Sequence, residues 1–218
     1  AIWRSLVGSE MCIRDRLSFL RTPMKTPKKF LLNYLYISFI VLFSGEIQAE
    51  NVLPVYDSLG GEFEMQSTLG KAVGPKDFEG KLQLIYFGYT SCPDICPTTL
   101  TVIKQAVEEL DPSGEQIQVL LITVDPERDS LEKMKIYLEF FHPGFVGLRA
   151  PLEDVQKIAK QFGAFFIKDE VNQSAVGYLV THTGYTYLLD RKGRVRKMFS
   201  SKVDVPEMIE TVNLLLKP

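Results

Sequence analysis

Two cysteines, each followed by a proline, come directly after a run of apolar residues. The run covers residues 82–87 and ends at Gly88, and Cys92 and Cys96 follow it. An apolar run of this length predicts a buried strand. A proline disfavours the α conformation in the residue before it, so we expect neither cysteine to lie in a regular helix. Pro97 is well suited to the first position of a helix. The stretch therefore predicts two neighbouring thiols at the carboxyl end of a core strand, where the start of a helix lowers thiol pKa values.

The first 61 residues are predicted to lie outside the folded domain. Residues 1–23 resemble a translated sequencing adapter or a disordered leader, and we exclude them, with Cys12, from the fold. Residues 24–49 combine three lysines with a 14-residue apolar stretch at 30–43, which is typical of a signal peptide or an N-terminal membrane anchor. The stretch is shorter than the about 20 residues of a bilayer span. Both interpretations place the rest of the chain outside the cytoplasmic membrane, in the periplasm, secreted or anchored, after a linker at 50–61.

Residues 62–218 are enough for one domain with a full core. Residues 50–218 carry 18 Lys and Arg against 24 Asp and Glu, and this acidic balance argues against nucleic-acid binding. Only Cys92 and Cys96 belong to this domain. An exported domain with two close cysteines indicates a redox pair or metal ligands rather than a disulfide scaffold.

The order of predicted elements indicates the fold class. It begins with a strand in 62–69 that turns at Gly70. A polar segment at 169–174 is expected to lie outside the strands on either side of it. We expect strands at 81–88, 117–124, 145–148, 165–168, 178–181, 185–190 and 195–199, and helices at 97–110, 131–141, 152–162 and 205–216. This order predicts an α/β, thioredoxin-like fold, with a mixed central sheet, helices on both faces and an N-terminal β-hairpin extension.

Three interpretations of Cys92 and Cys96 compete. The pair could be a redox-active dithiol, but generic thioredoxin-like oxidoreductases space their cysteines by two residues and carry a proline before a later strand. Here no proline lies between Pro151 and Pro206, and His182 stands in that loop. The pair could be a structural disulfide, but so short a loop gives little entropic stabilisation. The pair could bind a soft metal ion, Cu(I) above all and Zn(II) as a competitor.

A metal site would need a third ligand beside the two cysteines. His182 precedes the strand at 185–190, which in this fold lies beside the central strand, so its imidazole should approach the cysteine loop. His142 precedes Pro143-Gly144, and we interpret it as a helix-end cap. Asp94 and Asp125 could tune the site or contact a partner, although a turn residue and a helix cap are the simpler interpretations.

Several motifs resemble the Sco/SenC family of copper-binding proteins over about residues 60–216. They are YFGYTSCPDICPTTL, TVDPERDS, VTHTGYTYLLD and KGRV. The resemblance implies a thioredoxin-like fold that binds a copper ion, Cu(I) or Cu(II), through Cys92, Cys96 and His182. Two positions depart from the family's pattern: Thr181 stands where many relatives have an acidic residue, and Ser91 stands where a histidine is often found.

The resemblance also implies a function. The protein would be a copper chaperone for the binuclear copper centre of cytochrome c oxidase, with the copper-centre subunit as its partner. Other copper carriers or thiol reductants are further partners, and the N-terminal segment allows membrane association. The alternative is a thiol-disulfide oxidoreductase that reduces cysteines of a partner protein, with Cys92 and Cys96 as the redox-active pair. Any enzymatic role would be of this second kind.

Overall fold

The computed structural model describes residues 53–174 and 177–217. The expected leader and signal or anchor segment, residues 1–49, lies outside this part of the chain. None of the helices within the described part is both long enough and apolar enough to cross a membrane.

A seven-stranded mixed sheet forms the centre of the domain, in the order β2-β1-β5-β4-β3-β8-β9. Strands β3, β4 and β5 run parallel, and the other pairings are antiparallel. The strands are β1 (Met65–Ser67), β2 (Ala72–Val73), β3 (Leu82–Gly88), β4 (Ile117–Thr123), β5 (Val146–Arg149), β8 (Thr186–Leu189) and β9 (Val195–Phe199). Every residue of β3 and of β4 is buried, as expected of strands that are covered on both faces.

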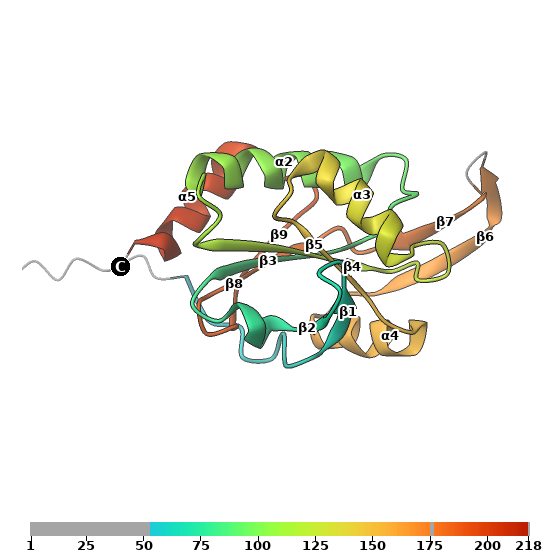
Figure 1. Cartoon of the computed structure of the whole chain (residues 1–218), viewed down its shortest axis with the longest axis horizontal. Coiled ribbons are helices and arrows are strands. Elements are labelled where there is room, and N and C mark those ends of the chain that lie inside the picture. The colour runs from blue at the N-terminus through green and yellow to red at the C-terminus, as the bar shows by residue number, and fades with distance from the viewer. Residues whose placement is uncertain (1–52, 175–176, 218) are drawn as a thin grey trace, which may run out of the picture. The chain divides into compact units, whose positions relative to one another are not determined.

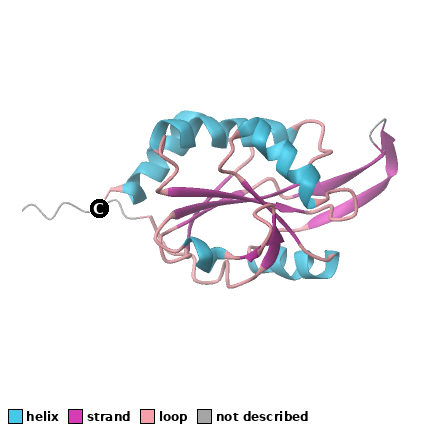
Figure 2. Ribbon diagram, in the orientation of Figure 1, coloured by secondary structure: helices cyan, strands magenta, loops and turns pink. Residues whose placement is uncertain are grey.

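Helices cover both faces of this sheet, as the sequence predicted. Helices α2, α3 and α5 lie on one face, and α4 and the short helix η1 lie on the other (Figure 1; Figure 2). Their bounds are η1 (Pro75–Phe78), α2 (Ile95–Leu110), α3 (Leu131–Phe141), α4 (Leu152–Gln161) and α5 (Val205–Leu216). The expected thioredoxin-like arrangement is confirmed. The N-terminal hairpin also forms, with Gly70 at φ +78°, and β1 joins it to the central sheet through β5.

A second, two-stranded sheet projects from one end of the central sheet (Figure 1). It consists of β6 (Phe166–Ser174) and β7 (Gly177–His182), which pair antiparallel with Phe166 opposite His182. The expected polar interruption at 169–174 is therefore wrong, because β6 continues through these residues with a register shift between Asp169 and Ser174. Polar residues are compatible with a strand here because the hairpin stands apart from the central sheet.

Helix α2 begins two residues earlier than predicted, at Ile95. Cys96 therefore lies in the first helical turn, which corrects the expectation that both cysteines precede the helix. The first four backbone N–H groups of a helix have no intrahelical acceptor, so Pro97 breaks no hydrogen bond in this turn. The preference of a pre-proline residue for extended backbone is overridden at this position.

The residues 53–61, which we expected to be linker, contact the domain. The Tyr56 N–H donates to the Val195 carbonyl oxygen at 2.9 Å. The Arg196 guanidinium donates to the carbonyl oxygens of Leu53 and Pro54 and forms an ion pair with Asp190 at 3.1 Å. Arg196 is buried, so its charge needs these partners.

Asp111 fixes the connection between α2, which follows the cysteine loop, and β4, which pairs with β3. Its side chain is buried and accepts hydrogen bonds from the N–H groups of Gln116 and Ile117, both at 2.8 Å, and of Glu115 at 3.1 Å. Burial alone would raise the pKa of Asp111, but these bonds, together with one from Ser113, lower it below its ordinary value.

We predict that Asp111→Asn lowers the free energy of unfolding at pH 7 by about 2 to 3 kcal/mol, because an amide cannot accept all these bonds. The folded-state pKa of Asp111 is lowered, so its contribution is complete above the unfolded pKa of about 4 and is lost as the pH falls through the folded value. Urea unfolding between pH 3 and 7 measures this. Glu108→Gln, on the exposed side of α2, is the control and should change stability by less than about 0.5 kcal/mol. Equal effects of the two variants would contradict the prediction.

Candidate metal centre

Two free thiols lie where β3 passes into α2. Cys96 is fully buried in the first turn of α2, and Cys92 is half-buried in the preceding loop. Gly88, the last residue of β3, makes room for the buried sulfur. A Cβ at Gly88 would lie 3.1 Å from Cys96 Sγ and 2.8 Å from a ring carbon of Tyr86. Glycine at the end of this strand is therefore needed for Cys96 to pack against it.

His182 brings an imidazole to these sulfurs from the end of β7. Its Nε2 atom lies 3.5 Å from Cys96 Sγ, and its Nδ1 atom lies 3.2 Å from the carbonyl oxygen of Thr183. A carbonyl oxygen can only accept a hydrogen bond, so Nδ1 carries the proton of the neutral ring. Nε2 then carries the lone pair, and this atom faces Cys96 Sγ.

The three predicted site residues converge on one point. The donor atoms of Cys92, Cys96 and His182 all lie within 4.8 Å of one another. Metal–sulfur bonds of about 2.3 Å and metal–nitrogen bonds of about 2.0 Å put two ligands of one ion at most about 4.6 Å apart. In a trigonal arrangement, the sulfur and nitrogen atoms would be about 3.8 Å apart. Small side-chain movements would thus allow a single ion to contact all three donors.

Two tyrosines surround this group of donors. The Tyr86 hydroxyl donates to Cys96 Sγ at 3.6 Å, and the ring edges of Tyr86 and Tyr89 pack against the imidazole with centroids 6.1 and 6.0 Å away. Burial raises the pKa of Tyr86, so its hydroxyl stays protonated and remains a donor. Both tyrosines belong to the buried core, and the sequence alone did not predict their contacts with the imidazole and the sulfur.

The two thiols differ in acidity. A hydrogen bond from Cys96 lowers the pKa of Cys92, and burial opposes this shift. The hydrogen bond with Cys92 and burial both raise the pKa of Cys96. In the metal-free pair, the negative charge therefore resides on the half-exposed Cys92, and Cys96 keeps the proton.

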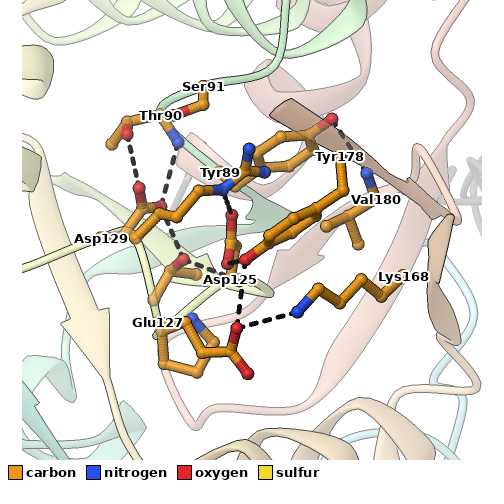
Figure 3. Close-up of polar contacts among 12 residues, drawn as sticks. Tyr89, Thr90, Ser91, Asp125, Glu127, Asp129, Lys168, Tyr178 and Val180 are labelled. Atoms are coloured by element: carbon orange, nitrogen blue, oxygen red, sulfur yellow. Dashed lines mark hydrogen bonds and ion pairs between the residues drawn. The ribbon is translucent and has the colours of Figure 1, made fainter. Parts of the chain in front are cut away.

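The other candidate residues take no part in this donor group. His142 ends α3, as expected, and its Nδ1 atom accepts from the Gly144 N–H at 3.0 Å. Asp94 is exposed at the start of α2 and makes no side-chain cap. Asp125 does not cap a helix, which corrects the simpler interpretation, because Ser130 caps α3. Asp125 instead accepts hydrogen bonds from Arg128 and Tyr178 (Figure 3).

The chain matches a known protein family. The SCO1/SenC family model matches residues 54–217. An SCO2-like protein of Rickettsia prowazekii is 37% identical over 152 residues, which cover 70% of this chain and 74% of that protein.

Solved structures share the fold. The crystal structure of Arabidopsis thaliana ScoI with copper bound has a TM-score of 0.66 and 31% identity, and the match covers 73% of this chain and 98% of that one. BsSco, described as a member of the Sco family of cytochrome c oxidase assembly proteins, shares the fold at 20% identity, with a TM-score of 0.62 and coverage of 76% and 98%. From the family-model match and the 37% identity to the Rickettsia protein, the chain belongs to the SCO1/SenC family.

Proposed function

We propose that this protein binds one copper ion through Cys92, Cys96 and His182 and delivers it during the assembly of cytochrome c oxidase. The observation that carries the proposal is the convergence of two sulfurs and one imidazole nitrogen within 4.8 Å. Membership of a family that includes a copper-bound ScoI supports the choice of copper.

The donor chemistry favours copper over harder ions. Thiolates are soft ligands that select Cu(I), and imidazole binds both Cu(I) and Cu(II). Two thiolates and one imidazole leave the fourth position of a tetrahedral ion open, whereas structural zinc sites close all four. An open position suits a carrier, because an acceptor protein can add its own ligand before the carrier releases the ion.

Cys92, the less buried of the two cysteines, gives the ion a route to an acceptor. Cys96 is buried and its sulfur is held by Tyr86, so we expect copper to leave Cys96 last. The acceptor that we propose is the copper-centre subunit of cytochrome c oxidase. The lysines and the apolar stretch within residues 24–49 support a site of action outside the cytoplasmic membrane.

Thiol-disulfide exchange is the second candidate function. The asymmetry of the pair favours it, since a half-exposed thiolate at Cys92 can attack a disulfide of a partner, and Cys96 can then resolve the mixed disulfide. Two electrons pass to the partner, which leaves as a dithiol, and a Cys92–Cys96 disulfide remains. Both functions use the same sulfurs, but only copper binding requires His182.

We predict that the reduced domain binds one Cu(I) per chain and that Cys96→Ser abolishes this binding. His182→Ala should weaken it by more than the roughly 10- to 100-fold typical of losing an outer-shell partner, because a ligand itself is removed. Competition with a chromophoric Cu(I) chelator measures both. His142→Ala is the matched control and should bind like the wild type. Unchanged affinity in His182→Ala would contradict the proposed ligand set.

A second prediction separates the two functions. His182→Ala should keep most of its ability to reduce a small disulfide substrate, because the sulfurs carry out the exchange. Stopped-flow measurement of the exchange rate, beside the copper affinity of the same preparation, tests this. Parallel loss of both activities would mean that the imidazole acts on the thiols themselves rather than on the metal.

A further inference from the structure

The histidine and the cysteines of the candidate metal centre belong to different sheets. Cys92 and Cys96 follow β3 of the seven-stranded sheet, whereas His182 ends β7, whose only ladder partner among the described strands is β6. Backbone pairing therefore does not fix the distance between the sulfurs and the imidazole. Residues 183–185 link His182 to β8, which pairs with β3, and side-chain contacts between the β6–β7 hairpin and the rest of the domain then orient the imidazole toward the sulfurs.

The loop between β4 and α3, residues 124–130, holds the cysteine side of the centre through Asp129. The carboxylate of Asp129 is fully buried. It accepts hydrogen bonds from the Thr90 N–H at 3.0 Å and from the Thr123 hydroxyl at 2.7 Å (Figure 3). Thr90 precedes Cys92 by two residues, so Asp129 anchors the cysteine loop to the end of β4.

The same loop holds the hairpin through Asp125 and Arg128. The Tyr178 hydroxyl, on β7, donates to Asp125 Oδ1 at 2.7 Å, and Asp125 also accepts from Arg128 Nε. The guanidinium carbon of Arg128 lies 3.7 Å from the centroid of the Tyr178 ring. This planar cation lies over the ring while its Nε–H donates to the Asp125 carboxylate. Tyr178 precedes His182 by four residues on the same strand.

Tyr89, in the cysteine loop, contacts β7 directly. Its hydroxyl accepts a hydrogen bond from the Val180 N–H of β7 at 3.2 Å, and its ring lies 5.6 Å from the Arg128 guanidinium carbon. One guanidinium thus contacts a tyrosine of the cysteine loop and a tyrosine of the histidine strand. Figure 3 shows Tyr89, Asp125 and Tyr178 gathered around this point.

We propose that loop 124–130 positions the copper ligands. Asp129 holds the cysteine loop, while Asp125 and Arg128 hold β7 through Tyr178, and together they set the distance between the His182 imidazole and the two sulfurs. This inference rests on the proposed copper binding by the same residues. Asp125, Arg128 and Tyr178 are positioning residues.

Tyr178→Phe tests the inference with a minimal change, because it removes only the hydroxyl, which donates to Asp125 Oδ1 at 2.7 Å and lies 3.3 Å from Glu127 Oε2. We expect the Cu(I) affinity to fall by about 10- to 100-fold, the range typical of partners that orient a ligand. We also expect the nitrogen hyperfine coupling in the electron paramagnetic resonance spectrum of the Cu(II)-loaded protein to weaken. Tyr185→Phe is the matched control, since it makes the same chemical change three residues after His182, at a half-exposed ring, and should alter neither measurement.

A double variant distinguishes positioning of His182 from general destabilisation. If Tyr178 acts through His182, Tyr178→Phe should cause no further loss of affinity in a His182→Ala background. Additive losses, or a Tyr178→Phe protein that binds copper as Tyr185→Phe does, would overturn the inference. Arg128→Lys keeps the charge but not the planar fork, and it should weaken binding in the same way as Tyr178→Phe.

A measurement without metal keeps the inference separate from the proposed function. Nuclear Overhauser contacts between the His182 ring and the Tyr86 and Tyr89 rings should be present in the metal-free wild type and in Tyr185→Phe, and should weaken in Tyr178→Phe. Unchanged contacts in Tyr178→Phe would refute the positioning role. Failure of the wild type to bind copper would refute the proposed function alone, because these contacts would still report on the position of the ring.

Discussion

The approach of the His182 imidazole to the Cys96 sulfur is the contact on which the candidate metal centre depends. The two residues are 86 positions apart and belong to different sheets, yet Nε2 and Sγ lie 3.5 Å apart. A two-stranded hairpin on its own is only marginally stable in water, so its position relative to the central sheet must come from tertiary contacts. The domain therefore combines two cysteines that follow a strand of the central sheet with a histidine whose position depends on the β6–β7 hairpin and its contacts.

The surroundings of the sulfurs make them suitable for reversible metal binding. The buried Cys96 has a hydroxyl donor in Tyr86, and the half-exposed Cys92 carries the negative charge of the pair. A buried charge without partners would be costly, and a fully exposed one would be open to oxidation. A fully buried sulfur beside a partly buried one allows an ion to be held by Cys96 and passed on past Cys92.

Local sequence signals predicted most of the fold, and the errors arose where distant partners decide the structure. The bounds of α3, β9 and α5 are confirmed because Ser130 and Asp204 cap their helices locally and Gly193 marks the β8–β9 turn. The extent of β6 and the role of Asp125 were wrong. Both depend on β7, and Tyr178, the partner of Asp125, lies 53 residues away in sequence. His182 was predicted from its place in the expected topology, but the tyrosines beside it had no local signal strong enough to separate them from the core.

X-ray absorption at the copper K-edge of the Cu(I)-loaded domain tests the central claim most directly. The account predicts a single copper ion with two sulfur neighbours and one imidazole nitrogen, and no second copper nearby. A first shell without imidazole, or one with a single sulfur, would contradict the claim that these three side chains form one metal site.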